Sequence, residues 1–263
     1  MKLRNLAMAL TLALLPLSGA AQADDALELL VPGELSVATE GTYPPFSMRA
    51  PSGQLDGLEI RVMQEIARRL DLQYKPVLVK WESVLIGLEA DQYDIISDAM
   101  DITPERQKKV TFADGWLESG GRIVVRDDSD ITKPADVAGH SVGALVASNW
   151  STLAEGLGAK VKTYKAESDA MQDLANGNVD AIITDSIAAA YAIKTSRLPL
   201  KLVEEPVSTI QKGFAIKKGK PHLVAAINKA LAEMIADGTY AKLTTDLIGV
   251  DPAPKDPIRT LPQ

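Results

Sequence analysis

The chain of 263 residues has no cysteine and only two histidines, and no apolar run after its first residues is long enough to span a membrane. The lack of cysteine excludes a disulfide framework and a thiolate metal site. No glycine-rich phosphate loop, H-E-x-x-H pattern or paired nucleophile and base stands out, so the sequence does not support a hydrolase or a nucleotide-dependent enzyme. His140 lies in a turn before a predicted strand and His222 at a predicted helix start, so we expect both at the surface.

The first 23 residues have the three parts of a secretory signal peptide. Lys2 and Arg4 supply the positive start, and the apolar run at 6–17 is too short to cross a bilayer. Ala21-Gln-Ala23 fits the cleavage pattern, with a buried N-terminal helix as the alternative interpretation. We therefore expect residues 1–23 to be removed and the protein to be secreted to a bacterial periplasm. The expected cleavage site has no cysteine to carry a lipid anchor.

Acidic residues outnumber basic ones by 35 to 28, which gives a formal net charge of −7. Loss of Lys2 and Arg4 with the signal peptide would take this charge from −7 to −9. An acidic protein is a poor nonspecific binder of nucleic acid or anionic lipid, so we expect no nucleic-acid partner. With 46% hydrophobic residues, the chain can bury one large core or two smaller ones.

Short apolar segments alternate with amphipathic ones, which is typical of an α/β fold. We predict strands at 35–39, 74–79, 93–97, 123–125, 141–145, 161–164 and 181–184. We predict helices at 62–70, 83–90, 149–157, 167–175 and 186–194, and another from Pro221 that ends at Gly238. The proline-rich tail at 251–257 is expected to lie over the surface.

Residues 88–98 and 174–185 share one plan: a helix end, a tight turn and a buried strand that delivers an aspartate at its end. The two aspartates are Asp98 and Asp185. Open α/β sheets bind ligands beyond the carboxyl ends of their strands, so the two segments predict two lobes with an aspartate each near one cleft. Two ordinary helix–strand junctions with solvent-exposed aspartates are the alternative.

Four motifs in order give the chain a resemblance to a known family. The segment Ser97-Asp-Ala-Met-Asp-Ile-Thr-Pro-Glu-Arg106, with a basic stretch and Phe-Ala-Asp114 after it, resembles the polar amino-acid-binding proteins of ABC importers, solute-binding protein family 3. The best-known members bind lysine/arginine/ornithine, histidine or glutamine. The other matching segments are 43–46 with 57–61, 179–185 and 232–240. Together they span nearly the whole chain after residue 23.

The resemblance implies a type II periplasmic-binding-protein fold, with two open mixed sheets flanked by helices, a hinge and an interlobe cleft. Lobe 1 would comprise 24–121 and 211–263, and lobe 2 would comprise 122–210, with crossings near 119–122 and 207–212. The implied function is capture of an amino acid or amino-acid-like molecule by hinge closure and delivery to an ABC permease in the inner membrane. We expect a monomer without a cofactor. A periplasmic enzyme on the same scaffold, such as a cyclohexadienyl dehydratase-like lyase, is the alternative.

The resemblance also implies a ligand-binding set, which comprises Glu40, Tyr43, Trp81, Asp98, Ala99, Asp101, Arg106, Ser148, Asn149 and Asp185. Arg106 follows Thr103-Pro104, a good helix start, where a guanidinium can hold a carboxylate through two parallel hydrogen bonds. An ion pair of Arg106 with Glu105 or Asp101 at the surface is the alternative. Asp185 matches the carboxylate that takes the ligand's α-ammonium in the family; a solvent-exposed helix cap is its alternative role.

Other members of the set have implied roles of their own. Ser148 and Asn149 fall where the family's second lobe supplies further contacts to the ligand carboxylate, and Asn149 is also a possible N-cap. Tyr43 and Trp81 match aromatic positions that enclose the ligand side chain, with core packing as the alternative for Trp81. Glu40 matches an acid that meets a distal ligand amine in cation-binding relatives, with a solvated role as the alternative.

The chain departs from the family at Ala99-Met-Asp101, where a Gly/Ser-x-Ser/Thr element is usual. An ionised aspartate cannot donate a hydrogen bond to a ligand carboxylate and would repel it. Asp101 therefore caps Thr103 or Arg106 locally, or binds a second cationic group of the ligand, or neutralises Arg106. In the last case the ligand need not be an α-amino acid. The four acids of the set outnumber Arg106, which favours a cationic or amine-rich ligand.

Overall fold

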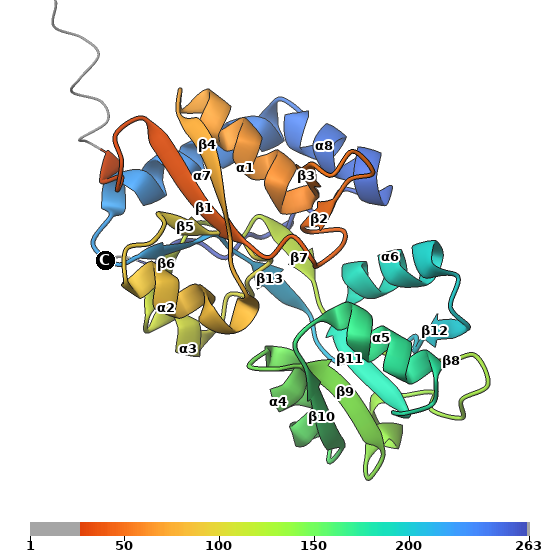
Figure 1. The fold of residues 1–263 in the computed structure, drawn as a ribbon. Coiled ribbons are helices and arrows are strands. Elements are labelled where there is room, and N and C mark those ends of the chain that lie inside the picture. The colour runs from red at the N-terminus through yellow and green to blue at the C-terminus, as the bar shows by residue number, and fades with distance from the viewer. Residues whose placement is uncertain (1–26, 262–263) are drawn as a thin grey trace, which may run out of the picture.

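The computed structural model describes residues 27–261, which form two lobes joined by a pair of strands (Figure 1). The expected signal peptide at residues 1–23 lies outside the described residues. Each lobe contains one five-stranded sheet with helices packed against it. No helix within residues 27–261 is both long and apolar enough to cross a membrane.

The sheet of the first lobe is mixed, with the strand order β4-β1-β5-β14-β6. β1 runs parallel to β4 and β5, whereas β14 runs antiparallel to β5 and β6. The strands are β1 (Glu34–Thr39), β4 (Gln73–Leu78), β5 (Ile95–Ile96), β6 (Val110–Phe112) and β14 (Ala215–Lys217). The helices are α1 (Leu58–Arg69), α2 (Val84–Glu89), α3 (Pro104–Gln107), α7 (Pro221–Ala236) and α8 (Thr239–Ile248). A small hairpin of β2 (Met48–Arg49) and β3 (Leu55–Asp56) and a 3₁₀ turn at Trp81–Ser83 complete the lobe.

Alternating side chains of β1 give this sheet a core on each face. Leu35 and Val37 are buried in the cluster that contains Ile66 of α1, whereas Ala38 is buried in the cluster that contains Leu88 of α2. Both faces of the strand are therefore covered by helices. The loop that follows β1, and with it the position of Glu40, is fixed by two cores.

The start of α1 holds the loop that carries Tyr43. Leu58 donates its backbone N–H to the carbonyl of Pro45 at 2.9 Å. Gly57 has a φ of 136°, and a Cβ there would lie 2.1 Å from the carbonyl oxygen of Phe46. Only glycine allows this close approach of helix and loop.

The sheet of the second lobe has the order β10-β9-β11-β8-β12. β9 runs parallel to β10 and β11, and β8 runs antiparallel to β11 and β12. Its strands are β8 (Gly121–Arg126), β9 (Ser141–Leu145), β10 (Lys160–Tyr164), β11 (Ala181–Asp185) and β12 (Leu200–Leu202). Its helices are α4 (Asn149–Gly156), α5 (Glu167–Ala175) and α6 (Ser186–Ser196), with a 3₁₀ turn at Pro134–Val137. Ile183 packs with Trp150 on one face, and Ile182 packs with Met171 on the other.

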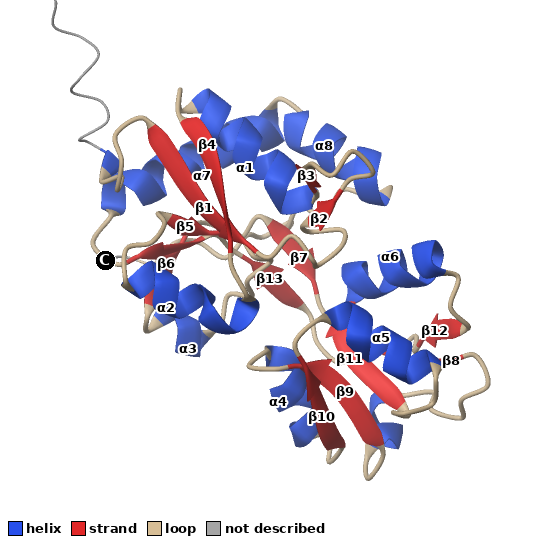
Figure 2. Cartoon of the chain, in the orientation of Figure 1, coloured by secondary structure: helices blue, strands red, loops and turns tan. Residues whose placement is uncertain are grey.

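Two short antiparallel strands, β7 (Leu117–Ser119) and β13 (Ile210–Lys212), lie between the lobes (Figure 2). The C-terminal tail packs against them, because Glu118 donates its backbone N–H to the carbonyl of Pro252 at 2.8 Å. Most of the tail at 251–257 is nevertheless exposed or half-buried, as predicted.

The α/β class and the seven predicted strands are confirmed, although the strand predicted at 93–97 shortens to Ile95–Ile96. The predicted helices are confirmed as well; the last of them, α7, ends at Ala236, two residues before Gly238, which has a φ of 80°. The strands that the sequence did not predict are β2, β3, β6, β7, β12, β13 and β14, each of two or three residues. Such segments are too short to carry a period-2 signal.

Candidate functional site

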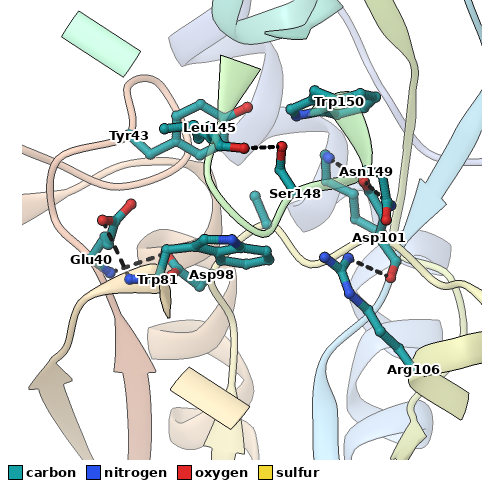
Figure 3. A pocket seen from close by; sticks show the side chains of 12 residues that line it. Glu40, Tyr43, Trp81, Asp98, Asp101, Arg106, Leu145, Ser148, Asn149 and Trp150 are labelled. Atoms are coloured by element: carbon teal, nitrogen blue, oxygen red, sulfur yellow. Dashed lines mark hydrogen bonds and ion pairs between the residues drawn. The ribbon is translucent and has the colours of Figure 1, made fainter. Parts of the chain in front are cut away.

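A cavity lies where the two lobes meet, at the carboxyl ends of β1, β5 and β9 and the start of α4 (Figure 3). Its empty space is about 370 Å³, which includes the solvent at its open mouth. Its lining comprises Glu40, Tyr43, Trp81, Asp98, Ala99, Asp101, Arg106, Leu145, Ser148, Asn149, Trp150 and Lys212. Nine of the ten residues expected from the sequence are in this lining, and Asp185 is the exception.

Arg106 presents a cation to one side of the cavity. Thr103 caps α3 by accepting a hydrogen bond from the Arg106 backbone N–H at 3.2 Å, and Pro104 is the first helical residue, as predicted. The guanidinium donates to the backbone carbonyl of Asp101 at 3.1 Å and lies 5.0 Å from the ring centre of Trp81. Burial lowers the pKa of Arg106. Within residues 27–261, no carboxylate forms an ion pair with this guanidinium.

The carboxylate of Asp101 pairs with Lys212 and not with Arg106. Its Oδ1 lies 2.7 Å from the Nζ of Lys212, and its Oδ2 accepts a hydrogen bond from the side-chain amide of Asn149 at 2.8 Å. Since Asp101 follows β5 in the first lobe and Asn149 begins α4 in the second, this bond crosses the cleft. Of the three interpretations left open by the sequence, none named Lys212 as the partner.

Lys212 is a fully buried cation between two carboxylates. Its Nζ lies 2.7 Å from Asp101 and 3.0 Å from Asp185, and its side chain is 1% exposed. The Nζ also lies 5.3 Å from the ring centre of Phe46 and 5.6 Å from that of Trp150. Burial acts to lower the pKa of Lys212, but the two carboxylates outweigh it and the pKa is raised. The lysine therefore stays charged.

Asp185 is withdrawn from the cavity. Its Oδ1 accepts hydrogen bonds from the backbone N–H groups of Ile187 and Ala188 at 2.8 and 3.4 Å, which makes it the N-cap of α6. Its Oδ2 accepts from the hydroxyl of Ser119 at 2.5 Å and from Lys212. The side chain is 0% exposed, and both oxygens are engaged within the protein. Asp185 therefore caps a helix, but it is buried and not solvent-exposed as the alternative interpretation of the sequence had it.

Two acids lie on the other side of the cavity from Arg106, with Trp81 between them and it in the view of Figure 3. Asp98 accepts a hydrogen bond from the backbone N–H of Glu40 at 3.0 Å, and its second oxygen has no partner among the described residues. Burial raises the pKa of both carboxyl groups, and the charge of Glu40 raises that of Asp98 further. No lysine or arginine of the described chain forms an ion pair with either acid.

Ser148, not Asn149, is the N-cap of α4, because its hydroxyl accepts from the backbone N–H of Ser151 at 3.4 Å. The prediction was wrong by one residue. Asn149 is the first residue of the helix, and its amide is free to reach Asp101.

Tyr43 and Ala99 complete the part of the expected set that lines the cavity. The ring of Tyr43 lies 5.2 Å from that of Phe46, and its buried hydroxyl has no partner among residues 27–261. Ala99 has a positive φ of 44°, and its backbone N–H donates to the buried carboxyl of Glu59 at 2.7 Å. This bond holds the turn that separates Asp98 from Asp101.

Three lining residues were absent from the expected set. Leu145 ends the predicted strand at 141–145, and Trp150 follows Asn149, so their neighbourhood carries a sequence signal. Lys212 lies in a predicted chain crossing but belongs to no motif. In the described part of the chain, no group of three or more His, Cys, Asp or Glu side chains is placed to hold a metal ion.

Residues 35–249 match the profile of the bacterial extracellular solute-binding proteins, family 3. The chain belongs to this family. The membership inferred from the four motifs is confirmed, and so is the two-lobed fold, because solved structures of amino-acid-binding proteins superpose on it.

The relatives of this family 3 protein are named for amino-acid binding. It is 33% identical over 223 residues to the L-cystine-binding protein TcyJ of Escherichia coli (strain K12), covering 83% of this chain and 84% of the relative. It is 28% identical over 233 residues to the histidine-binding periplasmic protein of Salmonella typhimurium, covering 84% of this chain and 90% of the relative.

Two solved structures that are similar to this chain are also of amino-acid-binding proteins. An ancestral arginine-binding protein bound to glutamine has a TM-score of 0.79 and 35% identity, covering 83% of this chain and 99% of that chain. The ancestral amino acid-binding protein AncCDT-1, described as a precursor of cyclohexadienyl dehydratase, has a TM-score of 0.76 and 32% identity, covering 82% and 95%.

Glu167, at the start of α5, is expected to make the stability of this family 3 protein depend on pH. Its two carboxyl oxygens are buried, and burial raises its pKa from 4.5 to about 8 although the nearby hydroxyl of Thr184 acts to lower it. The folded protein therefore holds a proton that the unfolded chain releases, and stability is lost as pH rises from 4.5 through 8. We expect Glu167→Gln to make this decrease in the free energy of unfolding smaller by a few kcal/mol, on the order of 1.4 kcal/mol per unit of pKa shift.

The measurement is urea unfolding of the wild type and the variant between pH 5 and pH 9. Glu155→Gln, on the exposed face of α4, is the matched control, and its free energy of unfolding should change with pH as that of the wild type does. If the Glu167→Gln curve also ran parallel to the wild type, the carboxyl would not be protonated in the fold.

Proposed function

We propose that the protein binds an amino acid or amino-acid-like molecule in the interlobe cavity and delivers it to an ABC permease in the inner membrane. The observation that carries the proposal is Arg106, a half-buried residue whose guanidinium lines the cavity without a carboxylate partner in the described chain. A ligand carboxylate satisfies such a group through two parallel hydrogen bonds. The names of the relatives, which bind cystine and histidine, support the same ligand class.

The opposite side of the cavity supports a distal cation on the ligand. Glu40 and Asp98 lie there together; burial raises the pKa of both groups, and the charge of Glu40 raises the pKa of Asp98 further. A ligand cation would oppose these effects and ionise both carboxyls. The ring of Trp81 lies beside the path between the two sides and suits an aliphatic stem or a guanidinium. We therefore favour a cationic amino acid or a close analogue.

Binding would proceed by closure of two lobes about a hinge. We propose lobe 1 as residues 24–121 and 211–263 and lobe 2 as 122–210, with β7 and β13 as the hinge strands. A ligand that touches Arg106 from one lobe and Ser148 or Asn149 from the other favours the closed state by its differential contacts. The closed shape is what the permease would recognise.

We propose a carrier and not an enzyme, exported to the periplasm as a monomer that needs no cofactor. His140 and His222 are exposed, as predicted, and neither lines the cavity. One observation favours the alternative of a dehydratase-like lyase: Asp98 lines the cavity with a raised pKa, as a general acid does. Incubation of the protein with prephenate-like acids separates the two functions, because a carrier leaves these acids unchanged.

The function is tested by a thermal-shift screen of ligand-stripped protein against amino acids, amines, opines and carboxylates. A ligand at about 100 times its Kd stabilises by roughly 2.7 kcal/mol, which is readily seen. We expect hits among carboxylates with a distal cation. Hits confined to compounds without a carboxylate would contradict the role of Arg106.

Glu40→Gln is expected to weaken binding of a cationic ligand by about tenfold or more, because it removes a half-buried carboxylate from the distal side. Isothermal titration calorimetry measures the change. The matched control is Glu89→Gln, an exposed acid at the end of α2 that does not line the cavity. Equal effects of the two substitutions would show that Glu40 acts only through general surface charge.

A further inference from the structure

In an α-amino acid, the ammonium and the carboxylate are bonded to the same carbon. If its carboxylate binds Arg106, its ammonium must find a carboxylate partner close to Arg106. The carboxylates next to this side of the cavity are Asp101, whose backbone carbonyl accepts from Arg106, and Asp185, which shares Lys212 with Asp101. The selectivity of the cavity for α-amino groups therefore depends on the state of these two side chains.

Both carboxylates are already paired with a cation of the protein. Lys212 donates to Asp101 at 2.7 Å and lies 3.0 Å from Asp185. The remaining oxygen of Asp101 accepts from Asn149, and the oxygens of Asp185 accept from Ser119 and from two backbone N–H groups of α6. No oxygen of either carboxylate is without a hydrogen bond.

A ligand ammonium cannot easily displace Lys212. The lysine side chain is 1% exposed, and its Nζ lies 5.3 Å from the ring centre of Phe46 and 5.6 Å from that of Trp150. A ligand ammonium beside Asp101 would be a second cation close to Lys212, in a buried region where solvent screens the repulsion little. Glu40 and Asp98, by contrast, have no cationic partner in the described chain.

We infer that Lys212 occupies the place of a ligand α-ammonium, so that the preferred ligand is a carboxylate with a distal amine or guanidine and no charge next to the carboxylate. The inference rests on the proposed function and narrows its ligand class to ω-amino and ω-guanidino acids. The carboxylate binds Arg106, the distal cation binds Glu40 and Asp98, and the carbon next to the carboxylate faces Lys212 and its two aspartates.

The test compares matched ligand pairs by isothermal titration calorimetry on the wild-type protein. The pairs are L-arginine, L-lysine and L-ornithine, each with its des-amino analogue, in which hydrogen replaces the α-ammonium. We expect the des-amino member of each binding pair to bind more tightly, by about tenfold. Tighter binding of the α-amino members overturns the inference and leaves the proposed function intact. If no member of any pair binds, the inference is overturned, and the wider ligand screen decides the proposed function separately.

A variant tests whether Lys212 is the cause. The double substitution Lys212→Met with Asp101→Asn removes one charge of each sign and leaves Asp185 for a ligand ammonium. We expect the affinity ratio to shift by about tenfold or more toward the α-amino members. Lys217→Met, on β14, the next strand along the chain, is the matched control and should leave the ratio unchanged. An unchanged ratio in the folded double variant overturns the inference, and if that variant does not fold, the wild-type ratio decides.

Discussion

Replacing Arg106 with alanine is expected to weaken binding of any carboxylate ligand by at least about a hundredfold. The half-buried guanidinium lies beside the cavity, and within residues 27–261 its side chain donates a hydrogen bond only to the backbone carbonyl of Asp101. Its removal would leave a desolvated ligand carboxylate without a counter-charge. Calorimetric titration with the tightest ligand of the screen measures the loss.

The same substitution should leave the fold nearly as stable as before. Arg106 forms no ion pair within residues 27–261, so no carboxylate is left unpaired. Arg49→Ala is the matched control for lost charge, because Arg49 is exposed on β2 and within the described residues its side chain bonds only to the backbone of Gly53. A loss of affinity below about threefold for Arg106→Ala, or an equal loss in the control, would mean that the ligand carboxylate binds elsewhere.

The second large effect concerns stability. Lys212→Met is expected to lower the free energy of unfolding by about 3–5 kcal/mol, because it leaves Asp101 and Asp185 as buried carboxylates without a cation. Adding Asp101→Asn to this variant should recover part of the loss, since one of the two unpaired charges is then removed. Urea unfolding at neutral pH measures both values.

The control for this prediction is Lys217→Met, which removes a lysine that is 38% exposed and pairs with Asp91 at the surface. We expect a change of about 1 kcal/mol or less there. If Lys212→Met lowered the free energy of unfolding no more than the control does, the ion pairs of Lys212 with its two aspartates would not stabilise the fold. A greater loss of stability in the double variant than in the single one would lead to the same conclusion.

The sequence pattern predicts most of the fold because each sheet contains strands of five or six residues, among them β1 and β9, that alternate with helices. It also predicts the location of the cavity, since Glu40 and Asp98 directly follow strands that end at one edge of a sheet. The hinge strands β7 and β13 have three residues each, so they appear only as a crossing between predicted elements. Their pairing is decided by the two lobes they connect and not by local propensity.

Asp98 and Asp185 show where local pattern fails. Both end a buried strand in the same sequence plan, yet Asp98 lines the cavity and Asp185 is fully buried. The difference comes from Lys212 and Ser119, which reach Asp185 from the hinge strands. Pairing between residues so distant along the chain leaves no signal in a single sequence.

The most direct test of the account is the distance between the lobes with and without ligand. Because the chain has no native cysteine, Ile86→Cys in α2 and Thr152→Cys in α4 would place one spin label on each lobe at exposed positions. Pulsed electron–electron double resonance then measures the separation, and Arg106→Ala in the same background is the matched control. We expect the tightest ligand of the screen to shorten and narrow the distance distribution, and to leave the Arg106→Ala distribution unchanged. An unchanged distribution in the wild-type background at saturating ligand would contradict capture by hinge closure.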